Sequence, residues 1–104
     1  MAKKLLPEYK YTCVSTAHIM PTDDKILQEQ SEHITPQLIC DHFAYGYWVY
    51  IPTGTINEEV QTMIELGLSA AFVELFKLAW NERCHFIKID RDGDDVDGLP
   101  KFEW

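Results

Sequence analysis

Three aspartates spaced two residues apart form the most conspicuous candidate site in the sequence. Asp90, Asp92 and Asp94 have the i, i+2, i+4 spacing of the first ligands in an EF-hand calcium loop. The match ends there, because an aspartate stands where that loop needs glycine and Lys101 stands where it needs a bidentate glutamate. We therefore treat the three aspartates as weak candidates for a divalent-cation site. A solvated acidic loop over residues 90–98 is the preferred interpretation.

A hydroxyl and an imidazole close the first apolar segment. Thr16 and His18 would share one face of a regular strand, so a hydrogen bond between them is sterically reasonable. A nucleophile activated in this way also needs a group that orients the imidazole and donors for the oxyanion, and neither is recognisable. We prefer a strand end whose polar groups satisfy the backbone. The alternative is a small hydrolase-like enzyme or divalent-metal-binding protein that uses His18 and the loop of residues 90–97.

Cysteine and histidine lie close together at two further points of the chain. Cys40 and His42 would share a strand face and could bind one metal, and Cys84 is followed directly by His85. No second pair at zinc-finger spacing accompanies them, so a core cysteine with a polar neighbour is preferred, and we expect no cofactor. With Cys13 the cysteines are odd in number and widely spaced, which predicts reduced thiols in a cytoplasm.

The composition is that of a small acidic globular protein. In 104 residues, 17 Asp plus Glu stand against 9 Lys plus Arg, which gives a formal charge of −8, and 46% of residues are apolar. The length predicts one domain, and the apolar fraction is too high for a disordered chain. No apolar run approaches the roughly 20 residues that span a bilayer. The charge argues against a cationic groove for nucleic acid, so direct nucleic-acid binding and membrane association are both disfavoured.

Hydrophobic periodicity predicts an α+β fold. Alternating apolar residues predict strands over residues 9–17, 38–43, 45–51 and 85–89, with a hairpin turn near Gly46. Helical periodicity predicts three helices between them, so the order is β-α-β-β-α-α-β. We expect a single domain over residues 1–104, with an antiparallel or mixed sheet and helices packed on one face. Residues 1–8 are a candidate disordered segment.

Local signals predict where the helices begin and end. Thr22 is placed to cap the first helix, residues 55–58 match a capping box for the second, and Gly67 is placed to end it. Ser69 is placed to start the third helix. Five large or apolar residues of that helix recur at helical spacing and predict one buried face: Phe72, Leu75, Phe76, Ala79 and Trp80.

Aromatic residues concentrate in the predicted strands, chiefly Tyr9, Tyr11, Tyr45, Tyr47, Trp48 and Tyr50. Aromatic strands can stack nucleic-acid bases, but residues 28–51 contain no Lys or Arg, so core packing or a protein interface is preferred. Bulky side chains on both faces of residues 47–51 predict a central or covered strand.

The C-terminal residues combine acidic and large apolar side chains. Residues 90–104 carry six acids against Arg91 and Lys101, so −4 of the −8 lies there. A free tail of leucine, phenylalanine and tryptophan would be an aggregation hazard, which predicts a segment lying across the body or within an interface. We therefore predict a basic, nucleic-acid-binding protein as the partner. The predicted partner-binding residues are Asp92, Asp94, Asp95, Asp97, Phe102 and Trp104.

Several short segments together resemble a known group of proteins. They are the S-T-A-H run of residues 15–18 and the closing L-P-x-F-x-W of residues 99–104, with the aromatic run of residues 45–49 and the helix start of residues 67–72. From about Thr12 onward the chain resembles a family of short uncharacterised bacterial proteins found near plasmid, phage and other mobile-element genes. The resemblance transfers no catalytic residues. It implies a small acidic non-enzymatic protein that inhibits a host nucleic-acid-binding defence system in the cytoplasm.

Overall fold

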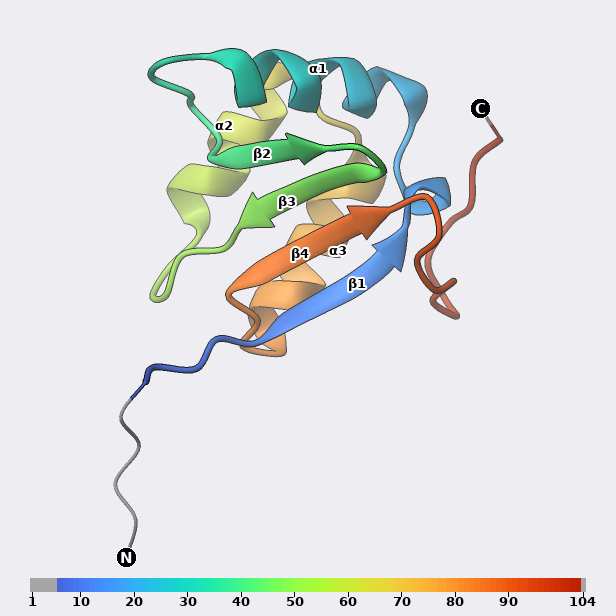
Figure 1. Cartoon of the computed structure of the whole chain (residues 1–104). Helices are drawn as coiled ribbons and strands as arrows, with labels where there is room; N and C mark the ends of the chain where they lie inside the picture. The colour runs from blue at the N-terminus through green and yellow to red at the C-terminus, as the bar shows by residue number, and fades with distance from the viewer. Residues whose placement is uncertain (1–5, 104) are drawn as a thin grey trace, which may run out of the picture.

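Strand β4 (Phe86–Asp90) lies inside a four-stranded sheet that joins distant parts of the chain (Figure 1). The computed structural model describes residues 6–103. The other strands are β1 (Tyr11–Ser15), β2 (Cys40–Phe43) and β3 (Gly46–Tyr50), and the order across the sheet is β1-β4-β3-β2. β1 runs parallel to β4, whereas β3 runs antiparallel to both of its neighbours. The sheet is therefore mixed, and the predicted hairpin between β2 and β3 is confirmed.

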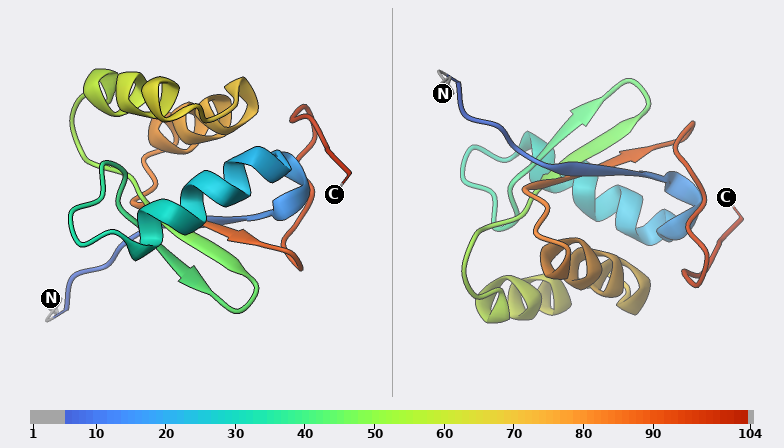
Figure 2. Two further views of the ribbon diagram at one scale, coloured as in Figure 1. Left: turned by 90° about the horizontal axis from the view of Figure 1, so that it is seen from above. Right: turned by 90° about the horizontal axis from the view of Figure 1, so that it is seen from below.

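The helices cover one face of this sheet. In Figure 1 the sheet faces the viewer, with α2 and α3 behind it and α1 along the top beside β2. The left panel of Figure 2 looks down on α1 and shows α2 and α3 together on one side of the sheet. Their bounds are α1 (Pro21–Glu32), α2 (Asn57–Leu66) and α3 (Ala70–Asn81), and a 3-10 turn, η1 (Thr16–His18), precedes α1. The predicted α+β class, single domain and β-α-β-β-α-α-β order are confirmed. None of the helices in residues 6–103 is long and apolar enough to cross a membrane.

The core lies between the sheet and the helices. Strand alternation points Val14, Val49 and Ile87 toward the helices. The buried rings of Phe72 and Phe76 on α3 belong to the same core cluster. Burial of each such side chain contributes roughly 1.5–3 kcal/mol. These contacts fix the helices on one side of the sheet.

A buried carboxylate joins the starts of two helices. The Asp23 side chain accepts a hydrogen bond from the Met20 backbone N–H at 2.8 Å and from the backbone N–H and hydroxyl of Ser69 at 2.7 and 2.6 Å. The prediction that Thr22 caps α1 is wrong, because Pro21 occupies the first helical position and places the cap at Met20.

The ends of α2 and α3 follow the sequence signals only in part. The capping box predicted over residues 55–58 does not form, because Ile56 is buried in the core and itself takes the cap position. Gly67 ends α2 at φ 90°, and Ser69 caps α3 through its side chain, as predicted. Trp80 does not share the buried face of α3. It is 37% exposed, because the last turn of the helix reaches a surface loop instead of the sheet.

The first strand is shorter than the predicted residues 9–17. It ends at Ser15, whose hydroxyl accepts a hydrogen bond from the Ala17 backbone N–H and starts the 3-10 turn. The turn takes Thr16 and His18 out of strand geometry, so they no longer share a face. Of the predicted disordered segment, residues 1–5 lie outside the described part of the chain.

Candidate partner-binding surface

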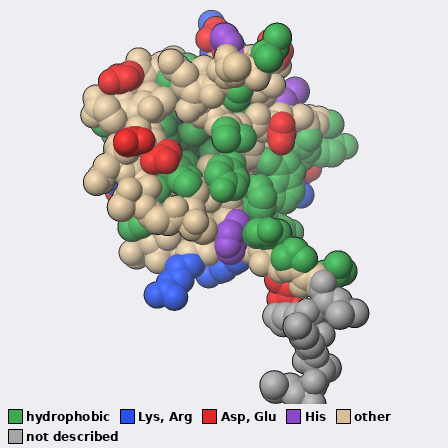
Figure 3. Space-filling model, turned by 90° about the vertical axis from the view of Figure 1, so that its left-hand side faces the viewer, with side chains coloured by type: hydrophobic (Ala, Val, Ile, Leu, Met, Phe, Trp, Pro, Cys, Tyr) green, Lys and Arg blue, Asp and Glu red, His purple; other side chains and the backbone are tan. Residues whose placement is uncertain are grey.

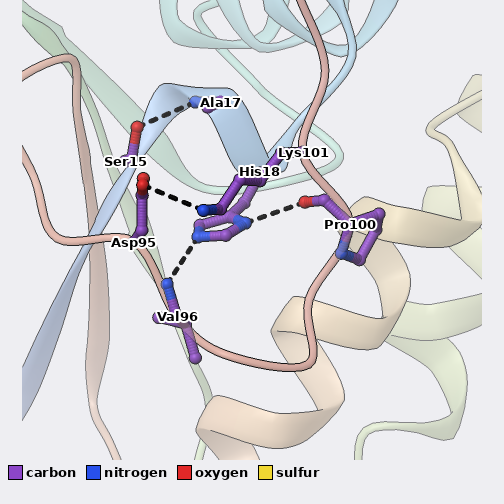
Figure 4. Close-up of polar contacts among 7 residues, drawn as sticks. All are labelled: Ser15, Ala17, His18, Asp95, Val96, Pro100 and Lys101. Carbon is purple, nitrogen blue, oxygen red and sulfur yellow. Dashed lines mark hydrogen bonds and ion pairs between the residues drawn. The ribbon is translucent and has the colours of Figure 1, made fainter.

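His18 is a buried polar residue with both ring nitrogens bonded to backbone (Figure 4). It is 1% exposed; its Nε2 accepts a hydrogen bond from the Val96 N–H at 2.8 Å, and Nδ1 lies 2.8 Å from the Pro100 carbonyl oxygen. A carbonyl can only accept, so Nδ1 carries the hydrogen and the imidazole is neutral. His18 therefore fastens the C-terminal residues to the end of β1.

These C-terminal residues, 91–103, form what we call the strap. The Asp94 carbonyl accepts a hydrogen bond from the Ser15 N–H at 3.0 Å, and the Ala17 carbonyl accepts one from the Phe102 N–H at 2.7 Å. Val96 and Leu99 of the strap pack against the core. The prediction that this segment lies across the body is therefore confirmed.

The start of the strap is a tight turn. The Asp90 carboxylate accepts a hydrogen bond from the Asp92 N–H at 2.9 Å, and the Asp90 carbonyl accepts one from the Gly93 N–H at 2.8 Å. A Cβ added to Gly93 would lie 2.5 Å from backbone atoms of Val14, so only glycine fits without displacement. The acidic loop is consequently held against the body at several points.

The acidic side chains of the strap point to solvent. One ion pair joins two of its own exposed residues, Asp95 and Lys101, at 3.1 Å. The exposed acids are Asp92, Asp94, Asp95, Asp97 and Glu103. The strap thus places the four predicted partner-binding aspartates on one segment, and Phe102 beside them is half-buried. Trp104 lies outside the described residues.

The candidate metal ligands are not gathered into a site. Within residues 6–103, no group of three or more His, Cys, Asp or Glu side chains is arranged to hold a metal ion. The Asp90 carboxylate, in particular, is engaged by the turn and by Lys88 at 3.7 Å. Cys40 is buried with its thiol directed at the Leu27 carbonyl, and His42 packs against the ring of Tyr47.

The predicted hydroxyl–imidazole pair does not form. His18 bonds to the strap backbone, and Thr16 lies in the turn before it. Because both imidazole nitrogens are engaged, the ring has no free position for proton transfer to a substrate. The contacts that the structure shows for the His18 ring are those that fasten the strap to the end of β1.

A second surface lies on the face of the sheet that no helix covers (Figure 1). We call it the open sheet face. Two of its tyrosines, Tyr11 and Tyr50, are 54% and 42% exposed. Figure 3 looks along the strands, onto the end of the sheet where β3 ends and β4 begins, and shows hydrophobic side chains gathered down the right-hand side. The strand register assigns to this face Asp41, Phe43, Trp48, Tyr50, Phe86, Lys88, Tyr11 and Cys13.

The rings on the open sheet face contact one another edge to face. The Trp48 centroid lies 5.1 Å from that of Tyr11 and 6.2 Å from that of Phe86. The Lys88 ammonium lies 5.4 Å from the Trp48 centroid and 5.5 Å from that of Phe43, within cation–π range. β3 is internal to the sheet, but the alternative that it is covered on both faces is wrong, because all three helices pack on one side.

A family model matches residues 11–104 of this sequence. Its description is the C-terminal domain of a family of unknown function, DUF5983. The chain belongs to the DUF5983 family. The match begins at the first residue of β1 and therefore takes in both the open sheet face and the strap. Searches of curated proteins and of solved structures return no match.

In this DUF5983 domain, the thiol nearest the two surfaces is kept in its neutral form. Burial raises the pKa of Cys13, Lys88 lowers it, and Asp90 and Asp94 raise it further. Since the thiolate is the reactive form, Cys13 is a poor nucleophile at neutral pH.

Proposed function

We propose that the protein is a small acidic non-enzymatic module that binds a protein partner through the open sheet face and the strap. The open sheet face carries this proposal. Large exposed apolar patches on a small domain mark interaction sites, and aromatic residues are enriched at the centres of protein interfaces. Tyr11 and Tyr50 remain exposed, although Val14 and Val49 on the opposite face of the same strands are buried.

The strap adds charge to this surface. It begins directly after β4, so its carboxylates follow the end of the strand that carries Phe86 and Lys88. A complementary partner presents Lys or Arg beside an apolar patch, and opposite charges steer such partners together at a rate that falls with salt. Because the strap is already fastened by His18, binding costs little further ordering of the chain.

At a finer level, we propose that the partner is a nucleic-acid-binding protein whose basic groove receives the strap carboxylates in place of phosphate. The resemblance to proteins encoded near mobile elements supports a role as an inhibitor of a host defence system. A cytoplasmic location is consistent with Cys13, Cys40 and Cys84, which are all free thiols.

Affinity capture with the full chain tests the surface. The captured partner is purified, and its Kd is measured against wild type and the double variant Y11S/Y50S. We expect the double variant to weaken binding by about tenfold or more, as truncation of aromatic anchors does. The matched control is Ile64→Ser, which makes an exposed apolar residue polar on α2, away from the sheet. Equal Kd values for the double variant and the control would exclude the open sheet face.

Salt dependence tests the charge. The association rate of wild type is expected to fall with ionic strength, and the triple variant D92N/D94N/D95N is expected to flatten that dependence. The control neutralises Glu58, Glu59 and Glu65 of α2, which removes the same number of negative charges outside the strap. An affinity that stays constant from low to high salt would overturn the basic-partner proposal.

A further inference from the structure

A hollow of about 550 Å³ lies at the end of the sheet opposite the strap. We call it the basic cleft. Its walls come from the loop after β3, the C-terminal end of α3 and the residue before β4. The residues that matter here are Thr53, Gly54, Trp80, Asn81, Arg83 and His85. A neighbouring hollow of about 620 Å³ shares Trp80 and Asn81 with it.

The full charges that line the two hollows, Arg83 and Lys77, are both positive, in a protein whose net charge is −8 with histidine neutral. Arg83 and His85 line the basic cleft, and Lys77 lines the neighbouring hollow. Two further charges act at the edge of the cleft: Glu82 raises the pKa of the lining thiol of Cys84, after burial, and Lys10 lowers it. The Lys10 ammonium donates a hydrogen bond to the Glu82 carbonyl at 2.8 Å, so Arg83 and Lys10 stand against one carboxylate. At physiological salt, charges within about 8 Å dominate the local potential, so the basic cleft favours an anion.

Arg83 holds its place in an unfavourable backbone conformation. Its φ is 64°, in the left-handed region, and its N–H bonds to the Trp80 carbonyl while the Cys84 N–H bonds to that of Ala79. These two bonds form the Schellman end of α3, where glycine is the usual residue. A side chain here costs roughly 1 kcal/mol, and such costs are found where a side chain serves a function.

Trp80 and His85 are fixed by hydrogen bonds to neighbouring loops. The Trp80 indole N–H donates to the Gly54 carbonyl at 2.7 Å, which holds a partly exposed ring as one wall of the basic cleft. The His85 Nδ1 accepts the Lys10 backbone N–H at 3.0 Å, so in the neutral ring Nε2 carries the hydrogen and is a donor. The cleft thus combines a flat aromatic wall with a guanidinium and an imidazole N–H.

We propose that the basic cleft binds a nucleoside monophosphate. The planar base lies against Trp80, and the phosphate accepts hydrogen bonds from Arg83 and the imidazole N–H of His85. Arginine and phosphate match in charge and in planar donor geometry, and bases stack on exposed indoles. Thr53 and Asn81 supply polar groups for the edge of the base. This site does not depend on the protein-binding function proposed above.

Titration of the full chain with AMP tests the site by NMR. The indole N–H signal of Trp80 is assigned with Trp80→Phe, which distinguishes it from the two other indoles. We expect AMP to shift this signal and the amides of residues 52–55 and 81–85, with a Kd of about 1 mM or tighter. No shift of these signals up to about 10 mM AMP would overturn the proposal.

Two variants separate binding from folding. Arg83→Gly relieves the backbone and is expected to raise Tm while weakening AMP binding by about tenfold, the loss of one charged contact. Arg91→Gln, which removes one charge at the strap end, should leave the AMP affinity unchanged. If both variants weaken AMP binding equally, the loss comes from the change in net charge alone, and the proposed site is overturned.

Two further probes separate the parts of the ligand. Adenosine and inorganic phosphate are each expected to bind more weakly than AMP. Phosphate that binds as tightly as AMP would overturn the role of Trp80 in stacking. Adenosine that binds as tightly as AMP would overturn the role of Arg83.

Discussion

The two ends of β4 carry opposite charge and are held in place by different anchors. At the acidic end, the buried imidazole of His18 takes two backbone hydrogen bonds and fastens the strap. At the basic end, the exposed indole of Trp80 makes one hydrogen bond to a surface loop. A hydrogen bond contributes more when water cannot replace it, so the two anchors differ in strength. The comparison teaches that two charged surfaces at opposite ends of one strand can depend on anchors of very different burial, 1% exposed for His18 and 37% for Trp80.

The largest expected difference in stability is between variants that remove the hydrogen bonds of each anchor but keep a side chain of similar size. His18→Leu leaves the Val96 N–H and the Pro100 carbonyl without their partner in a buried site, and we expect a loss of about 2–4 kcal/mol in the free energy of unfolding. Trp80→Phe removes one exposed hydrogen bond and is expected to cost about 1 kcal/mol or less. Urea unfolding measures both, and hydrogen exchange of residues 94–102 should rise only in the first variant. Similar losses of unfolding free energy in the two variants would contradict the inference that His18 is the stronger anchor.

A pair of glycine substitutions tests the same contrast in the backbone. Gly93→Ala drives a methyl group into the backbone of Val14 and should lift the strap, at a cost of about 2–3 kcal/mol. Gly54→Ala meets no atom within 4 Å and suffers only from its φ of 93°, which costs about 1 kcal/mol. Thermal unfolding of the two variants gives the comparison. A greater loss of stability for Gly54→Ala than for Gly93→Ala would show that the turn at the start of the strap accommodates the added methyl group by a small shift.

Two thiols report the charge at each end. Burial is the largest influence and raises the pKa of both thiols. Lys88 lowers the pKa of Cys13 while Asp90 and Asp94 raise it, and Lys10 lowers the pKa of Cys84 while Glu82 raises it. Asp94→Asn should therefore lower the pKa of Cys13, and Lys10→Gln should raise that of Cys84. Alkylation followed by mass spectrometry across alkaline pH should show faster reaction at Cys13 and slower reaction at Cys84.

Cys40 serves as the internal control for this experiment. Burial, followed by the charge of Asp41, raises its pKa to about 11. It should stay the slowest thiol in both variants below that pH, because the thiolate is the reacting form. Shifts of the same direction at Cys13 and Cys84 would contradict the opposite polarity of the two ends.

The smallest effect is expected for the ion pair on the strap. Lys101→Met removes the partner of Asp95, but both side chains are more than half exposed. Such pairs contribute between about 0 and 1 kcal/mol, so the free energy of unfolding should change by less than about 0.5 kcal/mol. A larger loss would mean that charge pairing, and not His18, holds the strap.

The order of elements could be predicted from the sequence because each strand and helix has its own periodicity. The hairpin at Gly46 and the helix boundary at Gly67 and Ser69 are likewise local signals. Trp80 was placed wrongly because periodicity identifies a helix face but does not say where the helix passes the edge of the sheet. For the same reason, the alternating aromatics of β3 were visible, but the side on which the helices pack was not.

The role of His18 depends on contacts that no local pattern contains. Its two partners, Val96 and Pro100, lie 78 and 82 residues further along the chain. The basic cleft was missed for a related reason, since its residues come from segments around 52–54 and 80–85. One local signal was present: Arg83 follows the last turn of a helix at a position where glycine is usual.

The parallel pairing of β1 with β4 also affects how fast the protein folds. Lys10 and His85, which meet at the start of this strand pair, are 75 residues apart, so most of the chain must be arranged before the pair can close. Such distant contacts slow folding, and mixed α/β domains accordingly fold between the microsecond helical bundles and the slow all-β proteins. Until β1 docks, one edge of β4 stays unpaired and can pair with another chain. The time at which β1 pairs with β4 therefore also decides how long this edge is open to aggregation.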